Sequence, residues 1–422
     1  MSARFPQEIF DYIIDYGNEA SRIDEVAQNF STVCKRWALR CRPYIFEDLY
    51  LSHQVYIDKW CENIPPTIDG PSKYVQHVSL DSGVGPLVSE PQPSEPYLDH
   101  FSAFTNVTTV KLAGHRGPVH MDTFFRGFSA FKNSLRALGI SSNLRFEDLS
   151  RIMEFFPNLD KLNVYPLLRP RRGEECPFQP PRRASFPNLR FLTLHSFSEF
   201  PELGDDLLFG LAEASMPILE ILIIIGTVPN LGGMQKLVDS SAQSLIIIYM
   251  DPLGESYSHR HTCAMLMIDP PSSPVELDLS ACDNLMYVGI YKGLYTGLLG
   301  PYLYDPLNKH KFEHALSTIK SPKLCAITVQ IHIKPAREEW EEEITERHDW
   351  THLDALLCGI LLRVRERVKD PSWRFMMRIT GSDQLIDGLT GGPLGADPPT
   401  SDQFLPQFQE MGGVVELDPD WD

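Results

Sequence analysis

The chain has 422 residues, of which 43% are hydrophobic and 22% charged, the composition of a globular protein long enough for several domains or one repeat array. A formal net charge of −18 argues against nucleic acid as a partner, because affinity for phosphate comes from Lys and Arg. The chain shows no membrane-spanning apolar run, no signal peptide and no CxxC pair among its eight cysteines, so we expect a cytoplasmic or nuclear protein with reduced thiols and no membrane partner.

Two apolar stripes of helical spacing lie in the first 51 residues. Pro6 suits the first turn of a helix, where its missing N–H would have no partner anyway. The first stripe consists of Ile9, Phe10, Ile13 and Ile14, and the second of Val26, Phe30, Val33, Cys34, Trp37 and Cys41. Two or three short helices cannot bury this much apolar surface on themselves. The stretch therefore needs the rest of the chain, a partner, or both.

Three groups of residues, in this order at the N-terminus, resemble the F-box as fungal sequences carry it: Phe5-Pro6-Gln7-Glu8-Ile9, Val33-Cys34-Lys35-Arg36-Trp37 and Tyr44-Ile45-Phe46. The resemblance implies that residues 1–51 form a helical domain that docks on a Skp-type adaptor and, through it, on a cullin ubiquitin ligase. The adaptor interface that it predicts consists of Phe5, Pro6, Ile9, Ile13, Val33, Cys34 and Trp37. The alternative is an ordinary helical cap on a larger fold.

From Phe46 onward a frame of three apolar positions recurs, in which two residues separate the first from the second and one separates the second from the third. The first seven intervals between copies lie between 24 and 32 residues, and helical patterns fill several of them. The copies begin at Phe46, Val75, Val107, Leu135, Leu159, Leu189, Leu219, Leu245, Leu285 and Leu324.

One strand and one helix per 20 to 30 residues is the unit of a leucine-rich repeat. The frame resembles that family in its irregular form, since the asparagine that usually follows is mostly absent. We therefore expect an α/β fold in which residues 52–380 form a leucine-rich-repeat-like solenoid with parallel strands and outer helices. A non-repeating α/β domain is the alternative.

Two intervals, after Leu245 and after Leu285, stretch to about 40 residues, through insertion or through a decayed repeat whose strand would be 275–279. A helix over 353–364 follows, for which Thr351 and Asp354 suit a capping box. Alternation over 373–379 predicts a last strand.

Residues 381–422 contain nine acidic residues and no Lys or Arg, which predicts a flexible acidic tail.

The alternation of side chains in a strand predicts a binding surface. If Leu219, Leu222 and Ile224 point into the core, their neighbours point to the open concave face. This surface consists of Ile221, Ile223, Ile225, Ile247 and Tyr249. An exposed apolar row of this kind indicates either a binding site for a protein substrate or a patch that another part of the chain covers. The tail could cover it through Leu385, Ile386, Phe404, Leu405 and Phe408.

The sequence His310-Lys311-Phe312-Glu313-His314 fits the HxxEH pattern of inverted zinc peptidases, in which two histidines hold zinc and the glutamate is the general base. No third ligand is recognisable, and Phe312, Leu316 and Ile319 already explain the helix as part of a repeat. We therefore expect no catalytic residue, no metal and no cofactor.

These patterns together predict a substrate-recruiting subunit of a Skp–cullin–F-box ubiquitin ligase that performs no catalysis itself. Its partners would be the Skp-type adaptor and an unknown protein substrate. One alternative is a leucine-rich-repeat scaffold outside any ligase, and a second is a zinc hydrolase built on His310, Glu313 and His314.

Overall fold

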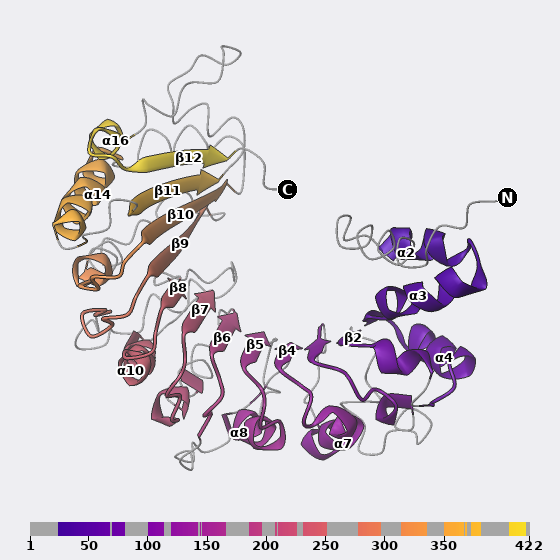
Figure 1. Ribbon diagram of the computed structural model, residues 1–422. Coiled ribbons are helices and arrows are strands. Elements are labelled where there is room, and N and C mark those ends of the chain that lie inside the picture. Colours follow the sequence, from indigo (N-terminus) through magenta and orange to yellow (C-terminus); the bar gives the residue numbers. More distant parts are fainter. Residues whose placement is uncertain are drawn as a thin grey trace. The chain divides into compact units, whose positions relative to one another are not determined.

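The computed structural model describes two compact units of the chain, and each is treated by itself (Figure 1). Unit 1 comprises residues 1–144 and 148–167, and unit 2 comprises residues 145–147 and 168–422. The residues that the structure describes are 24–67, 70–80, 100–113, 120–141, 144, 146–165, 185–195, 207–208, 210–225, 231–250, 277–296, 314–335, 350–366, 368, 373–380 and 405–418.

The described part of unit 1 consists of a pair of helices followed by a sheet of five parallel strands in chain order. The helices are α2 (Asp24–Ser31), α3 (Lys35–Ile45), α4 (Gln54–Asn63), α7 (Met121–Gly127) and α8 (Phe146–Phe155), with 3₁₀ turns η1 (Pro71–Tyr74) and η2 (Ser129–Phe131). The strands are β1 (Asp48–Leu51), β2 (His77–Leu80), β3 (Thr109–Leu112), β4 (Ala137–Ser141) and β5 (Lys161–Tyr165).

Unit 2 is a sheet of seven parallel strands, again in chain order. The strands are β6 (Phe191–His195), β7 (Ile221–Ile225), β8 (Ile247–Met250), β9 (Tyr287–Thr296), β10 (Ala326–Pro335), β11 (Arg374–Thr380) and β12 (Val414–Asp418). Helices α10 (Leu231–Ser241), α14 (Trp350–Arg365) and α16 (Pro406–Glu410) lie along one face of this sheet (Figure 1).

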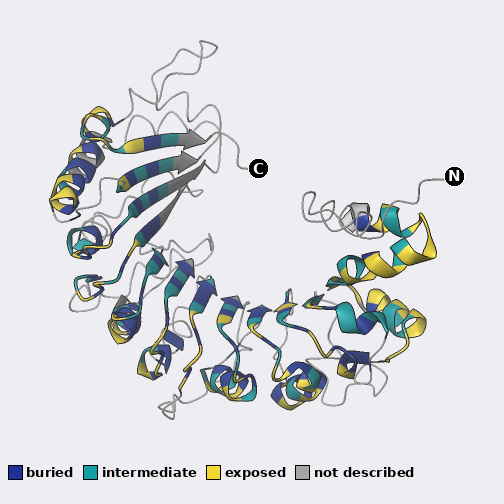
Figure 2. Ribbon diagram, viewed as in Figure 1, coloured by how far each residue is buried: buried dark blue, intermediate teal, exposed yellow. Residues whose placement is uncertain are grey.

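The recurring apolar frame forms the core of both units, as Figure 2 shows by burial. Every frame residue from Val75 to Val329 is buried, and the second and third positions of each copy lie in a strand. The frame repeats because each strand buries the side chains at its second and third frame positions in the layer between the sheet and the helices. The expected α/β fold with parallel strands is confirmed, and the arrangement is compatible with a repeat solenoid.

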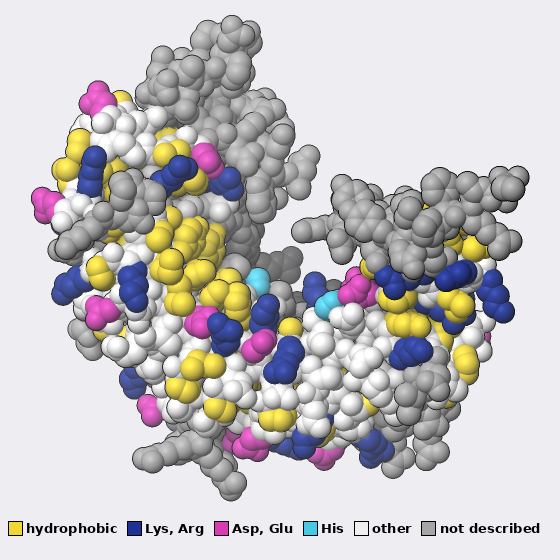
Figure 3. Space-filling model, viewed as in Figure 1, with side chains coloured by type: hydrophobic (Ala, Val, Ile, Leu, Met, Phe, Trp, Pro, Cys, Tyr) yellow, Lys and Arg dark blue, Asp and Glu magenta, His cyan; other side chains and the backbone are white. Residues whose placement is uncertain are grey.

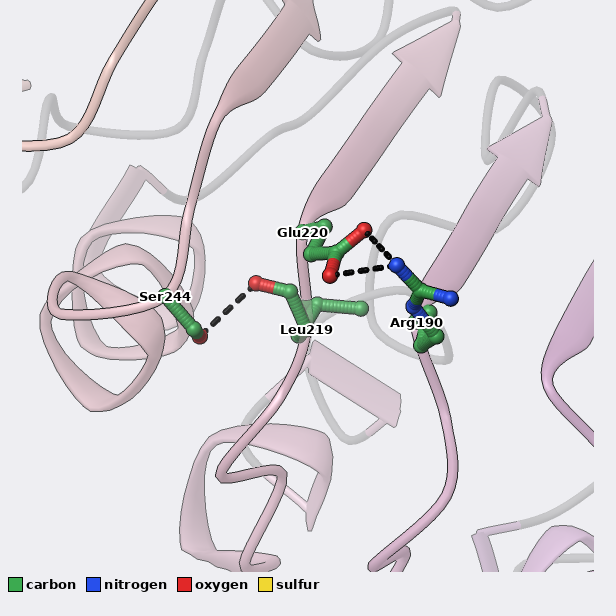
Figure 4. A network of polar contacts seen from close by, with 4 residues as sticks. All are labelled: Arg190, Leu219, Glu220 and Ser244. Carbon is green, nitrogen blue, oxygen red and sulfur yellow. Dashed lines mark hydrogen bonds and ion pairs between the residues drawn. The ribbon is translucent and has the colours of Figure 1, made fainter.

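Hydrogen bonds from polar side chains join successive copies of the frame (Figure 4). The Ser244 hydroxyl, directly before the frame residue Leu245, donates to the carbonyl oxygen of Leu219 in the preceding copy at 2.8 Å. Beside it, Arg190 donates to both carboxylate oxygens of Glu220 at 2.7 Å. The same arrangement recurs in four other copies. In each, the side chain of the Ser or Asn directly before a frame residue donates to a backbone carbonyl of the preceding copy: Asn106, Ser134, Asn158 and Asn284. These bonds satisfy backbone carbonyls where the chain enters a strand.

The structure decides between the two explanations for the first long interval. Strand β8 pairs directly with β9, with Ile248 opposite Val288. Residues 277–279 form no strand, although Leu277 and Leu279 are buried. Among the described residues, no other strand therefore lies between β8 and β9, which favours an insertion over a decayed strand.

The C-terminal stretch differs from the flexible tail that its charge predicts. Residues 405–418 form α16 and β12, and β12 adds a last parallel strand beside β11. The tail expectation was wrong here because Leu405, Phe408 and Val415 are apolar enough to be buried despite the acidic residues around them.

The expected capping box was also wrong. Helix α14 begins at Trp350, so Asp354 lies inside it. The Asp354 carboxylate instead accepts hydrogen bonds from the backbone N–H groups of Gln407 and Phe408 in α16.

Candidate functional site

Helices α2 and α3 in unit 1 have a small core of their own. Ala27 and Cys41 are fully buried, and four aromatic or aliphatic side chains pack around them: Phe30, Trp37, Tyr44 and Ile45. The rings of Phe30 and Trp37 meet edge to face at 5.4 Å between centroids. Trp37 is thus half-buried within the helical pair. Of the residues predicted to bind the adaptor, Phe5, Pro6, Ile9 and Ile13 lie outside the described residues.

Val33 and Cys34 lie in the turn that joins α2 to α3, and both are exposed. Val33 is 60% exposed, although valine is among the residues most often buried in proteins. Leu39 on α3, which the sequence prediction missed, is 48% exposed. The α3 helix therefore packs through Trp37 and Cys41 and leaves another part of its apolar surface open.

The exposed side of α3 also carries positive charge. Lys35, Arg36, Arg40 and Arg42 are all exposed, and the described helix contains no acidic residue. In a chain of net charge −18, this surface favours a partner with acidic side chains around an apolar contact.

In unit 2, four of the residues predicted to bind substrate lie together on one face of the sheet. Ile221 pairs with Ile247 and Ile223 with Tyr249 across β7 and β8, and all four side chains are half-buried. The side chain of Ile225 lies outside the described residues. The alternation was predicted correctly, because the intervening Leu222, Ile224 and Ile248 are fully buried on the helix side.

This face extends well beyond the predicted residues, and we call it the open-face band. In Figure 3 hydrophobic side chains gather over the middle strands of unit 2. One row of register partners runs across six strands and a second runs across seven. The first consists of Phe191, Ile221, Ile247, Tyr287, Ala326 and Arg374, and the second of Thr193, Ile223, Tyr249, Gly289, Thr328, Met376 and Val414.

Burial lowers the pKa of His195, which follows Thr193 by two residues at the end of β6. Burial therefore favours the neutral form of this imidazole.

The C-terminal residues do not cover this band with the side chains that the structure describes. Phe408 is fully buried and meets Phe375 edge to face at 5.0 Å. Phe375 pairs with the buried Ile327 in the rows that face the helices. The prediction that Phe408 covers the open face was wrong, because its ring packs against Phe375 on the helix side. Leu405 is buried. Leu385, Ile386 and Phe404 lie outside the described residues.

For the zinc motif, only His314 is described; it is half-buried in a helical turn, and His310 and Glu313 lie outside the described residues. Among the residues that the structure describes, no three His, Cys, Asp or Glu side chains come close enough to hold a metal ion.

In the part of the chain that the structure describes, no helix has the length and apolar character needed to cross a membrane. Comparison with known proteins finds no family model that matches the chain and no curated protein that matches its sequence.

Proposed function

We infer that the chain recruits protein substrates to a Skp–cullin–F-box ubiquitin ligase, with its N-terminal helices on the adaptor and its repeat sheet on the substrate. The resemblance of residues 5–46 to the F-box supplies the identity of the adaptor. The exposure of apolar side chains also supports an interface near the N-terminus. Of the nine large hydrophobic side chains that are most exposed among the described residues, five lie between residues 33 and 56: Val33, Leu39, Tyr50, Val55 and Tyr56.

Five such side chains within 24 residues is a high density of exposed apolar groups. Exposed apolar side chains scattered singly are common on proteins, but a cluster indicates a contact with another molecule. The helical pair keeps its own core through Ala27, Cys41 and Trp37, so Val33 and Leu39 are not needed to hold it together. Among the described residues, Val33 and Leu39 are therefore available to a partner.

The test uses substitutions at exposed positions. Val33→Asp and Leu39→Asp place a charge in the proposed contact, and we expect each to weaken co-purification with a Skp-type adaptor at least tenfold, since a buried unpaired charge at an interface costs more than about 1.4 kcal/mol. The matched control is Leu362→Asp on α14, because Leu362 is 45% exposed and Leu39 is 48% exposed.

All three variants should melt at the wild-type temperature, which separates loss of binding from loss of folding. Wild-type binding by both Val33→Asp and Leu39→Asp would overturn the proposed adaptor surface. If the unmodified chain itself fails to bind any Skp-type adaptor, the scaffold outside a ligase becomes the better account.

A further inference from the structure

One glycine makes room for an aromatic ring in the middle of the open-face band. Tyr249 on β8 stands opposite Gly289 on β9, and a Cβ added to Gly289 would lie 2.1 Å from the Tyr249 ring. The ring therefore lies over the backbone of β9. Its hydroxyl reaches Gln330 on β10 at 3.4 Å. The aromatic ring thus bridges three strands and fills the gap that glycine leaves.

Among the described side chains of the band, the only positive charge lies at its end. Arg374 on β11 stands in register with Ala326, at the end of the row that begins with Phe191 and passes Ile221, Ile247 and Tyr287. Arg374 is exposed, and no described carboxylate forms an ion pair with it. The neighbouring Arg378 is already paired with Glu416 at 2.8 Å. Among the described residues of the band, Arg374 is therefore the charge left for a partner.

The form of the occupant follows from the sheet. A peptide cannot add to the backbone of β7 to β10, because each of these strands is hydrogen-bonded to a neighbour on both sides. A partner must therefore lie across the strands and contact their side chains. Ile221 and Arg374 are four strand spacings apart, or about 19 Å, which an extended chain of about six residues covers.

We propose that the open-face band binds an extended segment of a protein partner, with an apolar side chain over Ile221, Ile223 and Ile247 and an Asp or Glu about six residues away at Arg374. The charge complementarity is directional, because the apolar side chains lie at the β6 to β9 end and the free cation lies at β11. This proposal deepens the proposed function, on which its role in choosing substrates rests, by naming the class of segment that is recruited.

The experiment selects peptides from a displayed library of random dodecamers on the purified full-length chain. Wild-type protein should enrich peptides with Leu, Ile or Phe about six positions from an acidic residue. Arg374→Glu should replace the acidic preference by Lys or Arg while the apolar preference stays. It should also weaken peptides selected on wild type at least tenfold. Arg363→Glu, at an exposed position on α14, is the matched control and should select the wild-type motif.

An Ile223→Thr variant tests the apolar end of the band. It should no longer select an apolar residue in the peptides, while the selection of an acidic residue stays. Absence of any enriched motif, or an acidic preference that survives in Arg374→Glu, would overturn the proposal. Because no adaptor is present in this selection, its failure is distinguishable from failure of adaptor co-purification.

Discussion

Burial controls the reactivity of thiols in unit 1. Cys34 lies in the exposed turn before α3, whereas Cys61 lies near the end of α4. Desolvation, together with a smaller effect of the Asp58 carboxylate, raises the pKa of the Cys61 thiol to about 11. The thiolate is the reactive form of cysteine, so a raised pKa slows reaction even where reagent can reach the sulfur.

At pH 8 we therefore expect iodoacetamide to label Cys34 well before Cys61, as measured by mass spectrometry of the peptides. Below its pKa of about 11, the thiolate fraction of Cys61 rises about tenfold per pH unit, so its labelling should accelerate between pH 8 and pH 10. Equal labelling rates for the two cysteines at pH 8 would show that the partial burial of Cys61 does not raise the pKa of its thiol.

At the scale of elements, α16 depends on a carboxylate from another helix. The Asp354 side chain on α14 is buried and accepts the N–H groups of Phe408 at 2.7 Å and Gln407 at 3.0 Å. These are N–H groups of the first turn of α16, which have no partner inside the helix. Leu405, just before this helix, has a left-handed backbone with φ of 51°. The hydrogen bonds that Asp354 accepts and the burial of Leu405 and Phe408 offset this local strain.

Asp354→Ala leaves the N–H groups of Gln407 and the buried Phe408 without their acceptor, and we expect it to destabilise α16 and β12 by about 2 kcal/mol. In hydrogen exchange, this corresponds to about 30-fold faster exchange of the protected amides of Val414–Asp418. Glu366→Ala, at an exposed position after the same helix, should leave the rates unchanged. Wild-type exchange in Asp354→Ala would rule out this role for the carboxylate.

The elements that the sequence predicts best are the strands that carry the apolar frame, because the frame reports the two side chains that each strand buries. The partner of Asp354 was not predictable, since a local motif with Thr351 competes with a contact to Gln407 and Phe408, more than 50 residues away in the chain. Likewise, the acidic composition of residues 381–422 predicted a flexible tail and outweighed the few apolar residues whose burial holds α16 and β12 against the rest of unit 2.

At the scale of the whole molecule, the open-face band was predictable only where strands follow one another closely in sequence. Alternation located Ile221, Ile223, Ile247 and Tyr249, because β7 and β8 are separated by a single helix. The sequence did not predict that Tyr287 and Arg374 belong to the band, because long intervals precede their strands and a sequence does not state which strands become neighbours. Register, visible only in the structure, joins these residues into one row.

The proposed function requires two surfaces of one chain, and each has its own variant. Val33→Asp changes the exposed turn before α3 without touching the sheet of unit 2. Arg374→Glu changes the charged end of the open-face band without touching the helical pair. A recruiting subunit must use both surfaces at once, whereas a scaffold outside a ligase needs only the second.

Ubiquitin transfer in a reconstituted assembly tests this requirement most directly. The assembly contains the Skp-type adaptor, the cullin, its ubiquitin-supplying enzymes and a reporter protein that carries a peptide selected on the open-face band. The account predicts transfer to the reporter with the unmodified chain and background transfer with either Val33→Asp or Arg374→Glu. Transfer at the wild-type rate with Val33→Asp would contradict it.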